Sequence, residues 1–325
     1  MKTPFRGLLP LLMVLSGMAA HAAMAQTYPV KPIRVVVPFP PGGTVDTVGR
    51  AMGQKYTEVW KQPVIVDNRP GAGGNIGADN VAKSAPDGYT LLLNVHGMAI
   101  SPGLYKKLPF DPIRDFTPVS QLTSSFLVLV AHPKLAANNV KELIALARSQ
   151  PGKLNYGSTG LGAPPHLAME IFKSVTRTDI VHVPYKGDAL QMPALLAGEV
   201  QIAFTPLPAA SGHMKAGKLR GLGMTGTKRS GEIPGVPTMI EAGVPDFAIT
   251  GWLGLFAPGG TPRDIVNRIS AETARIVNQT DIRQRLPGWG YEPVGSTSEA
   301  FAAKYRQDIA RYTKAIKDAR VPQLD

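Results

Sequence analysis

The sequence contains no cysteine among its 325 residues. This absence excludes disulfide bridges as a source of stability, and it also excludes a lipid anchor attached through a cysteine. It does not prevent folding in an oxidising compartment, because a chain of this length buries a sizeable core without covalent cross-links. The length predicts two domains or a single large one.

Long hydrophobic runs are also scarce. The longest near the start, Leu8–Val14, follows the basic residues Lys2 and Arg6 and precedes a series of small residues. That order is typical of a secretory signal, and the run is too short to cross the roughly 30 Å hydrocarbon core of a membrane. We therefore expect an exported chain whose signal is cleaved after Ala25, with Ala22 as the alternative position.

Acidic residues are fewer than basic ones. The chain has 35 Lys+Arg against 23 Asp+Glu, which gives a formal net charge of +12. The basic residues are dispersed and RNA-binding aromatic motifs are missing, so we do not expect a nucleic-acid partner. A basic exported protein instead attracts anionic small molecules or a membrane surface.

Common enzyme motifs are absent or out of context. There is no Walker A sequence, and Tyr156 stands where a nucleophile elbow around Ser158 needs its first glycine. Gly221, Gly223 and Gly226 match the dinucleotide fingerprint, but the residues that follow, "TKRSGEIPG", cannot open the required helix. The sequence therefore predicts no cofactor.

Histidines are few and scattered. They lack the pairing and the carboxylate neighbours of a metal site, so no metal is expected. The mature chain carries His96, His132, His166, His182 and His213. His166, near the start of an apolar helix, is more typical of a structural histidine than of a base. The enzymatic alternative is an exported serine hydrolase that uses Ser158 and His166, with Asp179 or Asp188 as a third member.

The residues that are present alternate between short strands and longer helices. Ile33–Val37 is a β-branched strand, and apolar residues at helical spacing follow it. The same alternation continues along the chain, which predicts an α/β protein with mainly parallel sheets and helices on both faces. A strand, a glycine-rich loop and a helix occur at 38–44 and again at 156–165, as two similar lobes would produce. Ligands of such sheets bind at the carboxyl ends of the strands.

The first of these loops, in "PFPPGGTVD", lacks catalytic side chains. Gly42 and Gly43 allow the backbone to approach a ligand closely, and Thr44 is a predicted N-cap. The free amides of the next helical turn bind a carboxylate without a lysine or arginine. Asp46 lies in the same turn, where stabilising its own helix is a better interpretation than contacting the ligand.

The second loop, in "GSTGLGAPPH", has a similar composition. It combines the hydroxyls of Ser158 and Thr159 with two glycines, Gly160 and Gly162. The helix that follows begins with two prolines at positions 164 and 165. Two such loops facing each other could hold a small dicarboxylate.

Five segments together resemble a known family. They are "YPVKPIRVVVPFPPGGTVD", "VIVDNRPGAGGNIGADNVAKSAPDGYTLL", "NYGSTGLGAPPHLAMEIF", "VHVPYKGDA" and "GVPDFAITGWLGLFAPGGTP", in this order over essentially the whole mature chain. The sequence resembles the Bug family, the extracytoplasmic solute receptors of tripartite tricarboxylate transporters. The resemblance implies a periplasmic, two-lobed binding protein, monomeric and not an enzyme, whose lobes close on a carboxylate in the cleft between them.

The resemblance also implies site residues. The family's first loop corresponds to Phe39–Gly43, with Pro41 where alanine is usual, and its backbone holds one carboxylate. The second loop corresponds to Thr159–His166, with Ala163 in place of a common ligand-binding serine. Members that bind amino acids carry an aspartate where this chain has Thr205. Because a buried ammonium needs a counter-charge, we expect a di- or tricarboxylate or an aromatic carboxylate without an α-amino group.

The resemblance further implies partners and lobe boundaries. Large and small integral membrane subunits would receive the ligand, although the same fold could present it to a sensor kinase instead. We expect a signal at 1–25, a first lobe at 26–124 that is completed by 247–325, and a second lobe at 125–246. The lobes would rotate about two crossovers, near 122–125 and 246–250.

Overall fold

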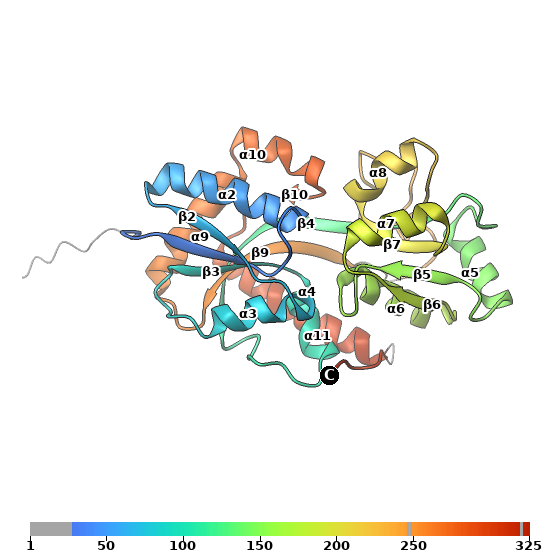
Figure 1. Cartoon of the computed structure of the whole chain (residues 1–325), viewed down its shortest axis with the longest axis horizontal. Helices are drawn as coiled ribbons and strands as arrows, with labels where there is room; N and C mark the ends of the chain where they lie inside the picture. Colours follow the sequence, from blue (N-terminus) through green and yellow to red (C-terminus); the bar gives the residue numbers. More distant parts are fainter. Residues whose placement is uncertain (1–27, 246, 248, 319–320) are drawn as a thin grey trace, which may run out of the picture.

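The computed structural model describes residues 28–245, 247, 249–318 and 321–325 (Figure 1). The predicted signal, residues 1–25, lies outside the described residues, as does Asp246 at the predicted lobe boundary. The described chain forms two α/β halves side by side along the longest axis of the molecule (Figure 1). None of the helices in this described part has the length and apolarity needed to cross a bilayer.

The first half is built on a sheet whose strands lie in the order β2-β1-β3-β9-β4. β1, β2 and β3 are parallel, whereas β9 runs antiparallel to both β3 and β4. The strands are β1 (Ile33–Val37), β2 (Val64–Asn68), β3 (Thr90–Val95), β4 (Phe116–Ala131) and β9 (Thr250–Pro258).

Helices cover both faces of this sheet, so its central strands β1, β3 and β9 are buried on both sides. In β1, Ile33, Val35 and Val37 pack in one core cluster with α2 and α9, while Val36 packs in another with α3, α4 and α11. This alternation is the two-residue period of a strand. The helices are α2 (Thr44–Trp60), α3 (Asn75–Ala82), α4 (Gly97–Leu104), α9 (Arg263–Val277) and α11 (Ser298–Asp318), with the short η1 (Ala72–Gly74) before α3.

The second half repeats the design with a smaller sheet. β5, β6 and β7 are parallel, and β4 runs antiparallel to both β7 and β8. Its strands are β5 (Asn155–Ser158), β6 (Val181–Pro184), β7 (Ile202–Pro206) and β8 (Arg220–Met224). Its helices are α5 (Val140–Ser149), α6 (Pro164–Thr176), α7 (Asp188–Ala197) and α8 (Leu207–Lys215). The structure confirms the α/β class, and the antiparallel strands make both sheets mixed.

β4 belongs to both halves. Its residues up to Phe126 pair with β9, and from Leu127 onward they pair with β7 and β8. This change of partner lies just past the crossover expected near 122–125. The chain returns to the first half at β9 and ends through α10 (Thr280–Arg285), η2 (Pro287–Trp289), β10 (Glu292–Pro293) and α11. β10 pairs with β4 at Thr123 and Ser124, beside the change of partner.

Candidate ligand-binding site

The first loop, residues 38–43, follows β1 and leads into α2. α2 begins at Thr44, and its N-cap is Gly43, whose backbone is extended and which makes no side-chain cap. The prediction that Thr44 caps the helix is therefore wrong, since Thr44 is the first helical residue. The capping acceptor comes from inside the helix instead, because Asp46 accepts a hydrogen bond from the amide of Gly42 at 2.9 Å.

The start of α2 carries unused backbone donors. The amides of Thr44, Val45 and Asp46 have no acceptor among the residues that the structure describes, and the first amide to pair is that of Thr47, with the carbonyl of Gly43 at 2.9 Å. Gly43 and Thr44 are exposed to solvent. Unused amides and the helix dipole give this end a partial positive charge, which suits a carboxylate.

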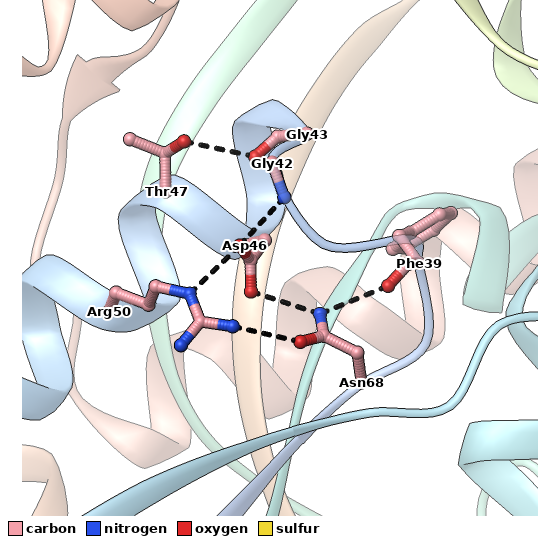
Figure 2. A network of polar contacts seen from close by, with 7 residues as sticks. All are labelled: Phe39, Gly42, Gly43, Asp46, Thr47, Arg50 and Asn68. Carbon is pink, nitrogen blue, oxygen red and sulfur yellow. Dashed lines mark hydrogen bonds and ion pairs between the residues drawn. The ribbon is translucent and has the colours of Figure 1, made fainter.

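A polar network holds the first loop in place (Figure 2). The buried carboxylate of Asp46 accepts hydrogen bonds from Gly42, from Nε of Arg50 at 2.9 Å and from Nδ2 of Asn68 at 2.9 Å. Nδ2 of Asn68 also donates to the carbonyl of Phe39 at 3.1 Å. Asn68 on the neighbouring strand β2 thus holds the start of the loop at Phe39 directly. It holds the end of the loop at Gly42 through Asp46.

The charge of Asp46 is stabilised by this network. Burial alone would raise the pKa of Asp46, but the hydrogen bonds from Arg50, Gly42 and Asn68 outweigh burial and lower it. Gly42 is needed for a separate reason: its φ of +81° is in the left-handed region, although no atom within 4 Å would obstruct a side chain there.

The second loop, residues 159–163, follows β5. Ser158, the last residue of β5, is fully buried, and its Oγ lies 2.6 Å from Nε2 of His182 on β6. The alternative of a serine hydrolase would pair Ser158 with His166, whereas the partner of Ser158 in the structure is His182. Tyr156 is opposite His182 in the parallel register, so Ser158, two residues on, faces the same side as both.

Three stacked rings support the second loop from behind. The ring of His182 stacks on Tyr156 at 4.7 Å and on His166 at 4.4 Å. Nδ1 of His166 accepts a hydrogen bond from the amide of Gly162 at 3.3 Å. Burial, and then the neighbouring His166, lower the pKa of His182 to about 4, and burial lowers the pKa of His166. His182 and His166 are therefore neutral rings when they form their hydrogen bonds with Ser158 and Gly162.

The second loop offers fewer helical donors than the first. Ala163 is the N-cap of α6, and the next two residues, Pro164 and Pro165, have no N–H. Thr159 and Gly160 are partly exposed, and the amide and hydroxyl of Thr159 have no acceptor among the described residues. The donors left for a ligand here come from the loop itself.

Thr205 lies on β7. It pairs with Val128 of β4, its side chain is fully buried, and its Oγ1 has no hydrogen-bond partner in the described chain. A contact between Thr205 and a ligand stays a prediction.

The arrangement does not assemble a hydrolytic triad. Among the described residues, no carboxylate forms a hydrogen bond with His166 or His182. Asp179 lies before β6, where its carbonyl accepts from Gly152, and Asp188 makes no side-chain hydrogen bond with a described residue. The described residues contain no group of three histidine, cysteine, aspartate or glutamate side chains that could hold a metal ion.

The two halves touch near the second loop. Gly162 has a φ of +77°, and a Cβ on it would lie 3.0 Å from Cδ2 of Leu104 and 3.2 Å from Oη of Tyr105, both in the first half. A second contact joins Gly290 and Pro208, where a Cβ on Gly290 would lie 2.3 Å from the proline ring. The loop at Gly162 therefore rests on the first half.

Sequence reasoning missed the residues that support the loops. Asn68, Arg50 and His182 were not assigned to the site, and neither was Tyr105. Asn68 had a readable signal, because a polar residue at the carboxyl end of a strand lies at the same sheet edge as the first loop. His182 could be found only from the strand register.

This fold, with two α/β halves joined through the shared strand β4 and loops rich in backbone donors, defines a solute-binding protein. The family model described as "Tripartite tricarboxylate transporter family receptor" matches residues 48–321. The chain belongs to this family, the TctC or Bug receptors, whose members are periplasmic.

Solved structures support the assignment. Rpa4515 of R. palustris, solved with adipate, is 35% identical with a TM-score of 0.84, covering 91% of this chain and 100% of that one. The periplasmic binding protein BugD is 30% identical with a TM-score of 0.81, covering 91% and 100%. MatC of Rhodopseudomonas palustris, with bound malate, is 32% identical with a TM-score of 0.80, covering 89% and 100%.

Proposed function

We propose that this protein is a periplasmic receptor that captures a small carboxylate between its halves and delivers it to the large and small membrane subunits of a tripartite transporter. The observation that carries the proposal is the start of α2, where the amides of Thr44, Val45 and Asp46 are unused. Two relatives of the same fold were solved with carboxylic acids, adipate and malate.

The binding chemistry follows from the loops. One carboxylate of the ligand accepts hydrogen bonds from the start of α2, and the second loop contributes the amide and hydroxyl of Thr159. Hydrogen bonds to a charged group contribute about 1.5–3 kcal/mol each. Several of them reach the roughly 8 kcal/mol that a 1 μM receptor needs. Thr205 supplies no counter-charge for an α-ammonium, so the ligand is a di- or tricarboxylate or an aromatic carboxylate without an α-amino group.

Closure is part of the proposal. The second lobe, residues 125–246, rotates against the first, 26–124 with 247–325, about β4 and the segment before β9. Each lobe contributes contacts that exist only when the lobes are closed, so a bound ligand favours the closed form. The cleavable signal ending at Ala25 exports the chain, and the closed monomer docks on the membrane subunits.

A thermal-shift screen tests the ligand class. Plain di- and tricarboxylates and aromatic carboxylates are expected to raise the unfolding midpoint, whereas aspartate and glutamate are not. Stabilisation by the amino acids alone would overturn the ligand class. Small-angle scattering tests closure, and an unchanged radius of gyration at saturating ligand would contradict it. N-terminal sequencing of the protein from a periplasmic extract tests cleavage after Ala25.

A further inference from the structure

The loops around the proposed site contain almost no polar side chains. They are the first loop, the second loop and a third loop, residues 70–74, which follows β2. Apart from Thr159, their residues are glycine, proline or alanine, with Phe39 and Leu161 as the large apolar exceptions. A ligand held among these loops therefore meets backbone groups and apolar side chains.

The three loops come together in the structure. A Cβ on Gly74 would lie 3.5 Å from Cγ of Pro38, so the third loop packs against the first. A Cβ on Gly73 would lie 3.2 Å from Oη of Tyr105, and a Cβ on Gly162 would lie at the same distance from that oxygen. Tyr105 therefore lies between the third loop and the second loop of the other half. All three loops follow the carboxyl ends of parallel strands, where sheets of this kind bind their ligands.

Large apolar side chains are exposed beside these loops. Leu161 of the second loop is 53% exposed, and Leu190 and Ile76 are each 55% exposed. Leu190 is in the first turn of α7, which lies next to the second loop because the amide of Gly187 donates to the carbonyl of Thr159 at 3.1 Å. Ile76 is in the first turn of α3, directly after the third loop. Covering such a side chain with a hydrocarbon surface removes apolar area from water, which is favourable.

The polar side chains near the loops are engaged elsewhere. The pairs are Ser158 with His182, Asp46 with Asn68, and Arg69 with Asp67. Two charged residues near the start of α7, Lys186 and Asp188, are exposed to solvent and therefore hydrated. The hydroxyl groups of a ligand would find few side-chain partners here.

The third loop keeps an apolar residue at a strained position. The φ of Ala72 is +46°, in the left-handed region that asparagine and aspartate tolerate better than alanine does. Ala72 is also exposed, so a polar side chain would be solvated there. An alanine in this conformation leaves the loop without a hydrogen-bonding side chain, at some cost in backbone strain.

We propose that the site is selective for carboxylates with a plain hydrocarbon body, aliphatic or aromatic, and that Leu161 and Leu190 are specificity-determining residues that cover this body. The inference rests on the proposed function, since the carboxylate itself binds at the start of α2. It narrows the di- and tricarboxylates and the aromatic carboxylates to those without hydroxyl groups. A hydroxyl carried into this site loses its water, and a buried hydroxyl without a hydrogen bond is unfavourable.

Four pairs of acids test the selectivity. The two members of each pair have the same carbon skeleton and differ only in their hydroxyl groups. The pairs are succinate with tartrate, adipate with galactarate, tricarballylate with citrate, and benzoate with 4-hydroxybenzoate. Dissociation constants are measured by calorimetry for the native protein. We expect the hydrocarbon acid of the tightest-binding pair to bind at least about tenfold more tightly than its hydroxylated partner.

Two variants test the residues. Leu161→Asn and Leu190→Asn keep the approximate size of the side chain and replace its apolar end by an amide. Each is expected to lower the preference within the tightest-binding pair at least about threefold, because the hydrocarbon acid loses its apolar contact. Ile113→Asn is the matched control, since Ile113 is 52% exposed in the turn before β4. It should preserve the native preference.

The outcomes separate the inference from the proposed function. A hydroxylated acid that binds as well as its hydrocarbon partner would overturn the selectivity, while the binding of a carboxylate would remain. An unchanged preference in both leucine variants, or an equal loss in Ile113→Asn, would overturn the role of Leu161 and Leu190. If none of the eight acids binds the native protein, the proposed function fails and the inference fails with it.

Discussion

The side-chain amide of Asn68 donates a hydrogen bond to the carboxylate of Asp46 at 2.9 Å, and thereby ties β2 to the first turn of α2. The same nitrogen donates to the carbonyl of Phe39, so a single side chain fixes the first loop at two places. Both hydrogen bonds, to Asp46 and to Phe39, need the N–H donors of the Asn68 amide.

Replacing Asn68 by aspartate is expected to release the first loop. The new carboxylate cannot donate to Phe39 and would repel Asp46, so the free energy of unfolding should fall by about 1–3 kcal/mol, the usual cost of leaving a buried polar group unpaired. Carboxylate affinity should fall as well. Urea unfolding and calorimetry measure the two effects, with the surface variant Gln54→Ala as the control. Native affinity in Asn68→Asp would show that the loop needs no such support.

Gly43→Val is expected to block ligand binding and leave the fold intact. The φ of the N-cap Gly43 is −75°, and a Cβ there would meet only the carbonyl of Pro40 at 3.5 Å, an ordinary contact. A branched side chain would instead cover the unused amides of α2. Gly231→Val, at a site with no atom within 4 Å of a Cβ, is the control. A folded Gly43→Val protein that binds normally would contradict the assignment of the first loop.

Stability is expected to decline as the pH falls from about 6.5 toward 4. Burial lowers the pKa of His182 to about 4, whereas an unfolded histidine titrates near about 6.5. Between these values the unfolded state binds more protons, so acidification favours unfolding, and the stabilisation is complete only above the unfolded pKa. His96, whose pKa burial also lowers to about 4, acts in the same direction.

The variant His182→Asn checks this origin. Its thermal midpoint should depend less on pH across the same interval than that of the native protein, with His96 accounting for the part that remains. His213→Asn removes a histidine for which no hydrogen bond through the side chain is described, and serves as the control. Identical pH profiles for the native protein and His182→Asn would refute the prediction.

Gly162→Ala is expected to weaken ligand binding more than it weakens the fold. The positive φ of Gly162 costs an alanine about 1 kcal/mol, and its Cβ would push against Leu104 and Tyr105 of the first half. Gly217→Ala has a similar positive φ of +69° and no neighbour within 4 Å, so it carries the same backbone cost without the contact. Equal affinity losses in the two variants would show that the contact between the halves does not matter for binding.

Much of the fold and both loops could be predicted because they depend on local patterns. The β-branched run of β1, the prolines and glycines after it and the apolar period of α2 are all read within a short stretch. The N-cap of α2 was predicted wrongly because the side chains of Thr44 and Asp46 are both able to accept a hydrogen bond from an amide at the start of the helix. Only the path of the backbone at Gly42 decides between them.

The partners of the site residues could not be predicted in the same way. His182 reaches Ser158 because β6 lies beside β5 in one particular register, and a shift of one residue would turn His182 to the other face. Asn68 and Asp46 are 22 residues apart and meet through the pairing of β1 with β2. Such contacts follow from how strands assemble, which single-residue patterns do not encode.

The shared strand β4 also sets the order in which the two sheets become complete as the chain emerges from its N-terminus. All strands of the second half's sheet are present once β8, ending at Met224, has emerged. The sheet of the first half, which starts the chain, stays divided between β3 and β4 until β9 arrives to join them. Because domains fold as units as the chain emerges, the part of the protein that is made first is finished last. The nascent first half must therefore wait with an open sheet edge while the inserted half is already formed.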